Sequence, residues 1–163
     1  MTDPRIWHIE HRLPTVDEHR RLAGSVGWAN DFHWPSLPGS LANSLYGVVV
    51  VAGDEVAGMG RVIGDGSMYF YIQDVAVSPG FQRMGIGQAI VDALLEWVRE
   101  RSPAFVGLFA TAQARELYRR NGFTDQYMTG MFRVLAPWDA ASPKDEGPPP
   151  ARKDPDSMGS EPS

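Results

Sequence analysis

Two glycines at the start of an expected helix are the residues of this chain best suited to chemistry. Gly85 and Gly87 lie in the string QRMGIG, which follows an apolar strand ending in VAV and a turn at SPG. Glycine lets a ligand approach main-chain N–H groups closely, and the dipole of the helix favours negative charge at its start. The spacing therefore predicts a site that holds a pyrophosphate with main-chain donors.

Two other glycine-rich phosphate loops do not fit this string. A dinucleotide-binding G-x-G-x-x-G needs a third glycine, but Ile90 stands there, and the acidic residue expected further on falls near the apolar Phe105. The string G-x-x-x-x-G-K-[ST] does not occur in the sequence. A tight strand-to-helix turn that binds no ligand is the remaining alternative.

Between its strand and helix, the glycine string resembles the [QR]-x-x-G-x-[GA] pyrophosphate loop of the GNAT superfamily of acetyl-CoA-dependent N-acetyltransferases. Further on, ARELYRRNGF, which starts at Ala114, resembles the family's A-x-x-L-Y-x-x-x-G-F segment. The resemblance covers roughly residues 45–134. It implies an acyltransferase that moves an acetyl group from acetyl-CoA to a primary amine of a small molecule, by direct attack in a ternary complex. A protein N-terminus or lysine as acceptor, and a non-catalytic acyl-CoA-binding module, are the alternatives.

The resemblance also implies which residues bind the acetyl-CoA co-substrate. Tyr118 would lie beside the sulfur and protonate the departing thiolate; its alternative role is in the apolar stripe of a short helix. Thr111 stands where the family often has an asparagine that contacts the cofactor. The pantetheine arm would pair with a bulged strand, whose Val75 N–H would face the acetyl oxygen. The remaining cofactor-binding candidates are Ala76, Val77, Gln82, Arg83, Met84, Gly85, Ile86, Gly87 and Gln88.

The acceptor must lose a proton before it attacks, because an alkylammonium has a pKa of about 10. A carboxylate or a water chain can take that proton. Asp74 is the only carboxylate near the end of the central strand, in the string IQDVAV. This string resembles the acidic strand of glucosamine-phosphate and polyamine acetyltransferases, although Gln73 replaces their glutamate. Asp74 is therefore a candidate to guide or deprotonate the amine, and a structural aspartate is the alternative.

Aromatic residues supply further candidates for the acceptor site. The segment WANDFHW at residues 28–34 could hold an amine on an apolar or ring-bearing body, although its rings could equally be ordinary packing residues. Alternating tyrosines on the central strand could add hydroxyl groups. The substrate-binding candidates are Trp28, Phe32, His33, Tyr71, Gln73 and Asp74.

Composition excludes several classes of function. The chain has 163 residues, no cysteine and a net charge of −5, which gives no basic footprint for nucleic acid. No apolar run approaches the ~20 residues that span a bilayer. The four histidines show no metal-ligand spacing, so we expect no metal. The N-terminus lacks the layout of a signal peptide, which favours the cytoplasm.

The pattern along the chain predicts one domain and a tail. Seven of the thirteen prolines lie in residues 137–163, which we expect to be a disordered acidic tail. Residues 1–136 form the expected GNAT-like domain: a twisted mixed sheet of about six to seven strands in an α/β (mixed α+β) fold, with helices on both faces. Pairing of sheet edges into a homodimer is common in the resembled family. Expected strands are residues 6–9, 45–52, 55–63, 68–77, 105–110 and 126–134, and expected helices are 15–26, 86–101 and 113–121.

Overall fold

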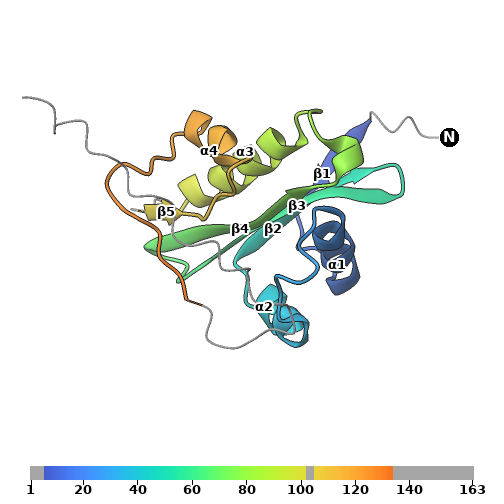
Figure 1. Ribbon diagram of the computed structural model, residues 1–163, viewed down its shortest axis with the longest axis horizontal. Helices are drawn as coiled ribbons and strands as arrows, with labels where there is room; N and C mark the ends of the chain where they lie inside the picture. The colour runs from blue at the N-terminus through green and yellow to red at the C-terminus, as the bar shows by residue number, and fades with distance from the viewer. Residues whose placement is uncertain (1–5, 102–104, 134–163) are drawn as a thin grey trace, which may run out of the picture.

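The computed structural model describes residues 6–101 and 105–133, which form one mixed sheet with helices on both of its faces (Figure 1). The strands lie in the order β1-β2-β3-β4-β5. Neighbouring strands are antiparallel except for β4 and β5, which are parallel. The predicted mixed sheet with helices on both faces is confirmed. The strands are β1 (Trp7–Glu10), β2 (Tyr46–Ala52), β3 (Glu55–Gly64), β4 (Tyr69–Val77) and β5 (Phe105–Gly107).

Two helices, α1 (Val16–Ser25) and α2 (Leu37–Ala42), cover one face of the sheet (Figure 1). A capping box begins α1: the Glu18 N–H donates to Thr15 Oγ1 at 3.2 Å, and the Thr15 N–H donates to Glu18 Oε2 at 2.7 Å. Both bonds satisfy amides that the first helical turn leaves free. A 3₁₀ turn, η1 (Trp34–Ser36), leads into α2, and the segment between α1 and this turn is irregular.

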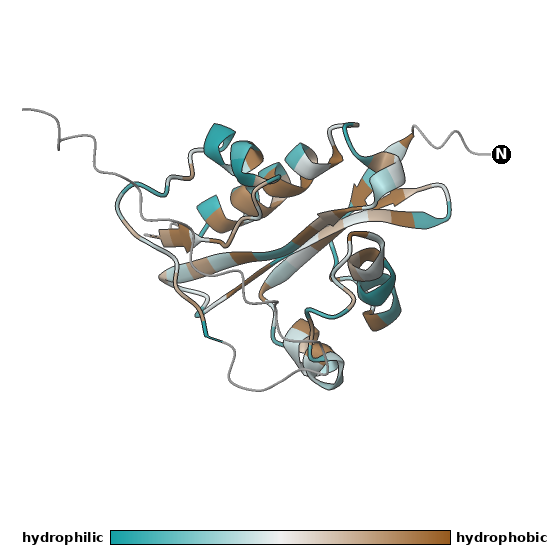
Figure 2. Cartoon of the chain, in the orientation of Figure 1, coloured by the Kyte–Doolittle hydropathy of each residue, from teal (hydrophilic) through white to brown (hydrophobic). Residues whose placement is uncertain are grey.

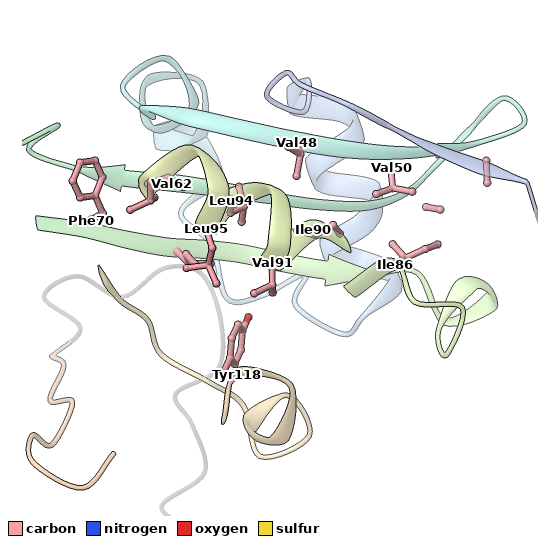
Figure 3. Close-up of a cluster of buried hydrophobic side chains, with 14 residues drawn as sticks. Val48, Val50, Val62, Phe70, Ile86, Ile90, Val91, Leu94, Leu95 and Tyr118 are labelled. Atoms are coloured by element: carbon pink, nitrogen blue, oxygen red, sulfur yellow. The ribbon is translucent and has the colours of Figure 1, made fainter. Parts of the chain in front are cut away.

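The other face of the sheet is covered by α3 (Ile86–Arg99) and α4 (Arg115–Arg120). Apolar residues recur along α3 at helical spacing and point at the strands, so the helix is brown towards the sheet in Figure 2. Figure 3 shows these side chains meeting valines of β2 and β3. This packing fixes the first turn of α3, and with it the glycine loop, against the end of β4. The buried residues of α3 are Ile86, Ile90, Val91, Leu94, Leu95 and Val98.

The expectation of six to seven strands is wrong for the described residues, which contain five. The expected strand at 126–134 is absent: residues 126–133 are not a strand, and Val134 lies outside the described residues. The strand expected at 105–110 ends at Gly107. A strand needs a hydrogen-bonding neighbour, and β5 is too short to offer one to the segment that follows. The segment is largely exposed, and one ring contact joins it to the residues after β5: the Phe109 and Phe132 centroids lie 6.3 Å apart.

Glycines at two turns adopt a positive φ that side chains disfavour. Gly122 has φ +86° directly after α4, and the Phe123 N–H donates back to the Tyr118 carbonyl at 3.1 Å, as in a glycine C-terminal cap. Gly53 has φ +61° between β2 and β3, as the first position of a hairpin turn favours.

The expected tail at 137–163 lies outside the described residues. Within the described part of the chain, no helix is long and apolar enough to cross a membrane.

Candidate active site

The glycine loop joins β4 to α3 and turns its amides away from the rest of the protein. Arg83 and Gly85 have left-handed φ angles of 62° and 80°, and Gly85 is the N-cap residue of α3. The amides of residues 83–88 donate to no acceptor within the described residues, and the first to do so is the Ala89 N–H, which donates to the Gly85 carbonyl at 3.0 Å. Free amides at a helix start form an anion-binding site.

The loop forms one wall of a cavity of about 730 Å³ between the ends of β4 and α4. Most of the predicted cofactor-binding residues line it, and so does Trp28. Met84 and Ile86 do not: Ile86 is a core residue, and Met84 packs against the same core. Gln82 fixes the loop to the strand, since its Nε2 donates to the Val77 carbonyl at 3.1 Å. The predicted residues that line this cavity are Val75, Ala76, Val77, Gln82, Arg83, Gly85, Gly87, Gln88, Thr111 and Tyr118. We call it the loop cavity.

The charge of the loop cavity suits an anion. Its only charged lining residues are Arg83 and Arg120. Neither arginine forms an ion pair within residues 6–101 and 105–133. Free guanidinium groups and main-chain amides are the donors that phosphate groups prefer.

Gly87 gives a test of whether a CoA pyrophosphate fits. A Cβ at this position would lie 3.5 Å from Leu117 and 3.8 Å from Val77, which is ordinary van der Waals contact. The fold itself therefore leaves room for a side chain at Gly87, yet the position is glycine and lines the cavity. Close approach of a ligand to the main chain explains this choice. The loop residues thus fit a pyrophosphate.

Tyr118 lies on α4 with its ring directed towards the core (Figure 3). The residue is 7% exposed, and burial raises the pKa of its phenol to about 12. Its hydroxyl bonds to no described residue. Among the described residues, His19 Nδ1 is the one fully buried polar side-chain atom that has no hydrogen-bond partner. Because the Tyr118 hydroxyl also lacks a partner but is not in this class, it is not fully buried. The Tyr118 hydroxyl is therefore free to donate to a ligand.

A second cavity, of about 560 Å³, lies on the other side of Tyr118. Its walls come from β5, from the turn after α4 and from Tyr71 on β4. Arg115 and Arg119 also line it, and both pair with Asp125. Tyr118 is the only residue that lines both cavities. We call this second space the aromatic cavity, for its rings Tyr71, Phe105, Phe109 and Phe123.

Asp74 is held in a buried cluster with two residues that the sequence analysis did not identify. Its Oδ2 lies 2.7 Å from Arg61 Nε and 2.9 Å from His19 Nε2. Burial opposes ionisation of Asp74, but the His19 hydrogen bond and the Arg61 charge outweigh it and lower the pKa of the carboxyl. An Arg and an Asp on apolar segments, each a charge that needs a partner when buried, were the available signal in the sequence. The geometry favours the structural alternative for Asp74.

The predicted acceptor residues are divided between separate places. Trp28 lines the loop cavity and Tyr71 the aromatic cavity. Phe32 packs edge-on against the His19 ring, with centroids 5.0 Å apart. His33 is exposed and pairs with Ser36 Oγ at 2.8 Å. Gln73 lines neither cavity and lies opposite Arg61 in the sheet. In the described residues, no three His, Asp or Glu side chains are grouped to hold a metal.

Comparison with known proteins agrees with this geometry. A model of the acetyltransferase (GNAT) family matches residues 6–123, and the chain belongs to this family. Family members use acetyl-CoA as the acetyl donor.

The chain is similar to two proteins of Glycine max. It is 33% identical over 120 residues to probable acetyltransferase TAP2, and the match covers 63% of this chain and 48% of that one. It is 36% identical over 77 residues to histone acetyltransferase TAP1, with 46% and 33% covered. The chain thus spans half or less of the length of these relatives.

Solved structures share the fold. A probable acetyltransferase from meticillin-resistant Staphylococcus aureus superimposes with a TM-score of 0.73 at 27% identity, covering 79% of this chain and 99% of that one. A GNAT family acetyltransferase from Streptococcus pneumoniae gives a TM-score of 0.69 at 29% identity, with 79% and 98% covered. Each match covers nearly the whole of the solved chain.

Proposed function

We propose that this domain transfers the acetyl group of acetyl-CoA to a primary amine of a small molecule, by direct attack in a ternary complex. The observation that carries the proposal is the place of Tyr118 between the two cavities. The loop cavity offers free amides and two guanidinium groups, which suit the phosphates of CoA. The aromatic cavity suits an amine with an apolar or ring-bearing body.

In this reaction the neutral amine nitrogen attacks the thioester carbonyl carbon, so that a C–N bond forms and the C–S bond breaks. The leaving thiolate takes a proton from the Tyr118 hydroxyl. The attacking nitrogen releases a proton to water, and the tyrosinate recovers one from water. The phenol is protonated at neutral pH, where even an ordinary tyrosine keeps its proton, and burial raises the pKa of Tyr118 further, to about 12.

Two further roles follow from the strand end. The Val75 N–H, at the wall of the loop cavity, would donate to the oxygen that gains negative charge during attack. Asp74 is a weak candidate for the base, because its lowered pKa and its bonds to Arg61 and His19 leave it little tendency to take a proton. Water is the better acceptor for the amine proton.

A thiol-release assay tests the proposal. Acetyl-CoA is incubated with benzylamine, an aliphatic diamine and a lysine-containing peptide, and free CoA thiol is measured over time. Turnover on an amine, with a mass increase of one acetyl group in that amine, supports the proposal. Binding of acetyl-CoA without turnover on any acceptor would instead support a non-catalytic acyl-CoA-binding module.

A lysine side chain of a protein is the second candidate acceptor. The observation that favours it is the similarity to histone acetyltransferase TAP1. The same assay separates the two candidates, since a protein acetyltransferase should turn over the peptide faster than either small amine.

A further inference from the structure

Asp74 has a backbone conformation that residues with side chains rarely adopt. Its φ is +55°, and Arg83 in the glycine loop is the only other non-glycine residue with a positive φ in the described part of the chain. The pairing of β3 with β4 shifts register at the same place: Met59 lies opposite Ala76, but Arg61 lies opposite Gln73. One extra residue of β4 is therefore accommodated there, as in a β-bulge.

Three elements hold this bulge through the Asp74 carboxylate. Arg61 comes from β3 and His19 from α1, and both bind Oδ2. Arg61 Nη1 also donates to the Ser40 carbonyl at 3.2 Å and to Ser44 Oγ at 2.9 Å, which connects α2 and the turn after it. Contacts from elements far apart in sequence therefore converge, directly or through Arg61, on a residue with an unfavourable φ.

Stability alone gives a poor account of this cluster. His19 is fully buried and Arg61 is 7% exposed. A buried ion pair is often no more stabilising than apolar side chains of the same size. The ionised Asp74 can only accept, so His19 Nε2 must carry the proton of their hydrogen bond. The other ring nitrogen, Nδ1, is buried and has no partner. The Asp74–Arg61–His19 cluster adds little stability but fixes the backbone of β4 in one conformation. A role in positioning the β4 backbone explains it better.

The bulge lies at the wall of the loop cavity, since Val75 and Ala76 follow Asp74 directly and line that cavity. We propose that Arg61 and His19 are positioning residues, which hold Asp74 in its left-handed conformation and thereby set the β4 backbone against bound acetyl-CoA. The effect on turnover rests on the proposed acyl transfer, whereas the effect on acetyl-CoA binding does not.

Glycine distinguishes a backbone role of Asp74 from a role of its charge. Glycine adopts a positive φ without strain, whereas alanine does not. Each is combined with Arg61→Met, so that no charge is left buried without a partner. The doubles Arg61→Met/Asp74→Gly and Arg61→Met/Asp74→Ala then differ only in how easily residue 74 adopts its conformation. Asp74→Asn is the third variant: asparagine tolerates this φ and its amide oxygen still accepts from Arg61. Arg61 loses its countercharge in this variant, so circular dichroism must first show that the protein folds.

The expected readouts are acetyl-CoA Kd by calorimetry and kcat by thiol release, with circular dichroism to confirm folding. The alanine double should raise Kd and lower kcat by about tenfold or more relative to the glycine double, the size of effect that left-handed strain predicts. Asp74→Asn should stay within about fivefold of the wild type in both. Equal values for the two doubles would overturn the proposal. A second result would also overturn it: an Asp74→Asn variant that folds and binds acetyl-CoA as well as the wild type but has the low kcat of the alanine double. That result would show that turnover requires the negative charge of Asp74 itself.

The Kd measurement needs no turnover. A wild-type protein that binds acetyl-CoA but acetylates no amine would end the proposed function, and the glycine and alanine doubles would still decide the positioning role.

Discussion

Gln88 and Asn121 are joined by a reciprocal pair of side-chain hydrogen bonds. Gln88 Nε2 donates to Asn121 Oδ1 at 2.9 Å, and Asn121 Nδ2 donates back to Gln88 Oε1 at 3.1 Å. Gln88 is in the first turn of α3, beside the glycine loop, and Asn121 ends the helix that carries Tyr118. The pair therefore ties the two parts of the site together across 33 residues of sequence.

Asn121→Ala should lower kcat by about three- to tenfold, because loss of both partly buried hydrogen bonds to Gln88, and of a third to the Leu117 carbonyl, loosens Tyr118 relative to the loop. Acetyl-CoA Kd should change less than kcat. Asn43→Ala is the matched control: like Asn121, Asn43 ends a short helix and donates from Nδ2 to a carbonyl four residues back at 2.8 Å. An equal fall in kcat in both variants would show that the effect is general destabilisation.

Tyr118→Phe should lower kcat by roughly ten- to a thousandfold, the range expected when one proton donor is removed. Acetyl-CoA Kd should stay within about twofold, because the hydroxyl acts on the leaving thiolate and the ring remains in the core. Steady-state kinetics and calorimetry measure the two quantities. Tyr69→Phe, at an exposed position on β4, is the control and should have wild-type kcat. Full turnover in Tyr118→Phe would assign the proton to water.

Gly87→Ala should raise acetyl-CoA Kd by about tenfold or more without loss of stability, since alanine is the better helix residue and its Cβ meets only ordinary contacts. Tm should be unchanged or slightly higher. Gly80→Ala is the control: a Cβ there meets no atom within 4 Å, and Gly80 does not line the loop cavity. Unchanged affinity in Gly87→Ala would mean that the pyrophosphate does not lie against this turn.

The elements that carry their own local signals could be predicted from the sequence. The capping box at Thr15 and the apolar stripe of α3 located their helices, because caps and helical periodicity are local patterns. The same local reasoning failed at residues 126–133, where strand-forming residues have no neighbouring strand to bind. Whether a strand forms there depends on the length of β5, which is a tertiary property.

The site divides in the same way. The glycine loop and Tyr118 belong to motifs, so the sequence predicted where they lie along the chain. The role of Asp74 could not be read in this way, because one of its partners, His19, is 55 residues away and only the packing of α1 on the sheet brings them together. A charged residue inside an apolar strand still predicts that a partner exists, as Arg61 does in β3.

The raised pKa of Tyr118 predicts a loss of stability in alkali. The unfolded chain releases the phenol proton around pH 10, whereas the folded protein holds it until about 12. Between these values the folded state binds more protons, so the free energy of unfolding falls as the pH rises. Relative to pH 9, the fall due to Tyr118 should be about 1 kcal/mol at pH 11. Urea unfolding of the wild type and Tyr118→Phe at pH 9, 10 and 11 measures it as the difference between the two proteins, in which the other tyrosines cancel. A constant difference across this range would contradict the raised pKa and show that the Tyr118 hydroxyl is more hydrated than its burial implies.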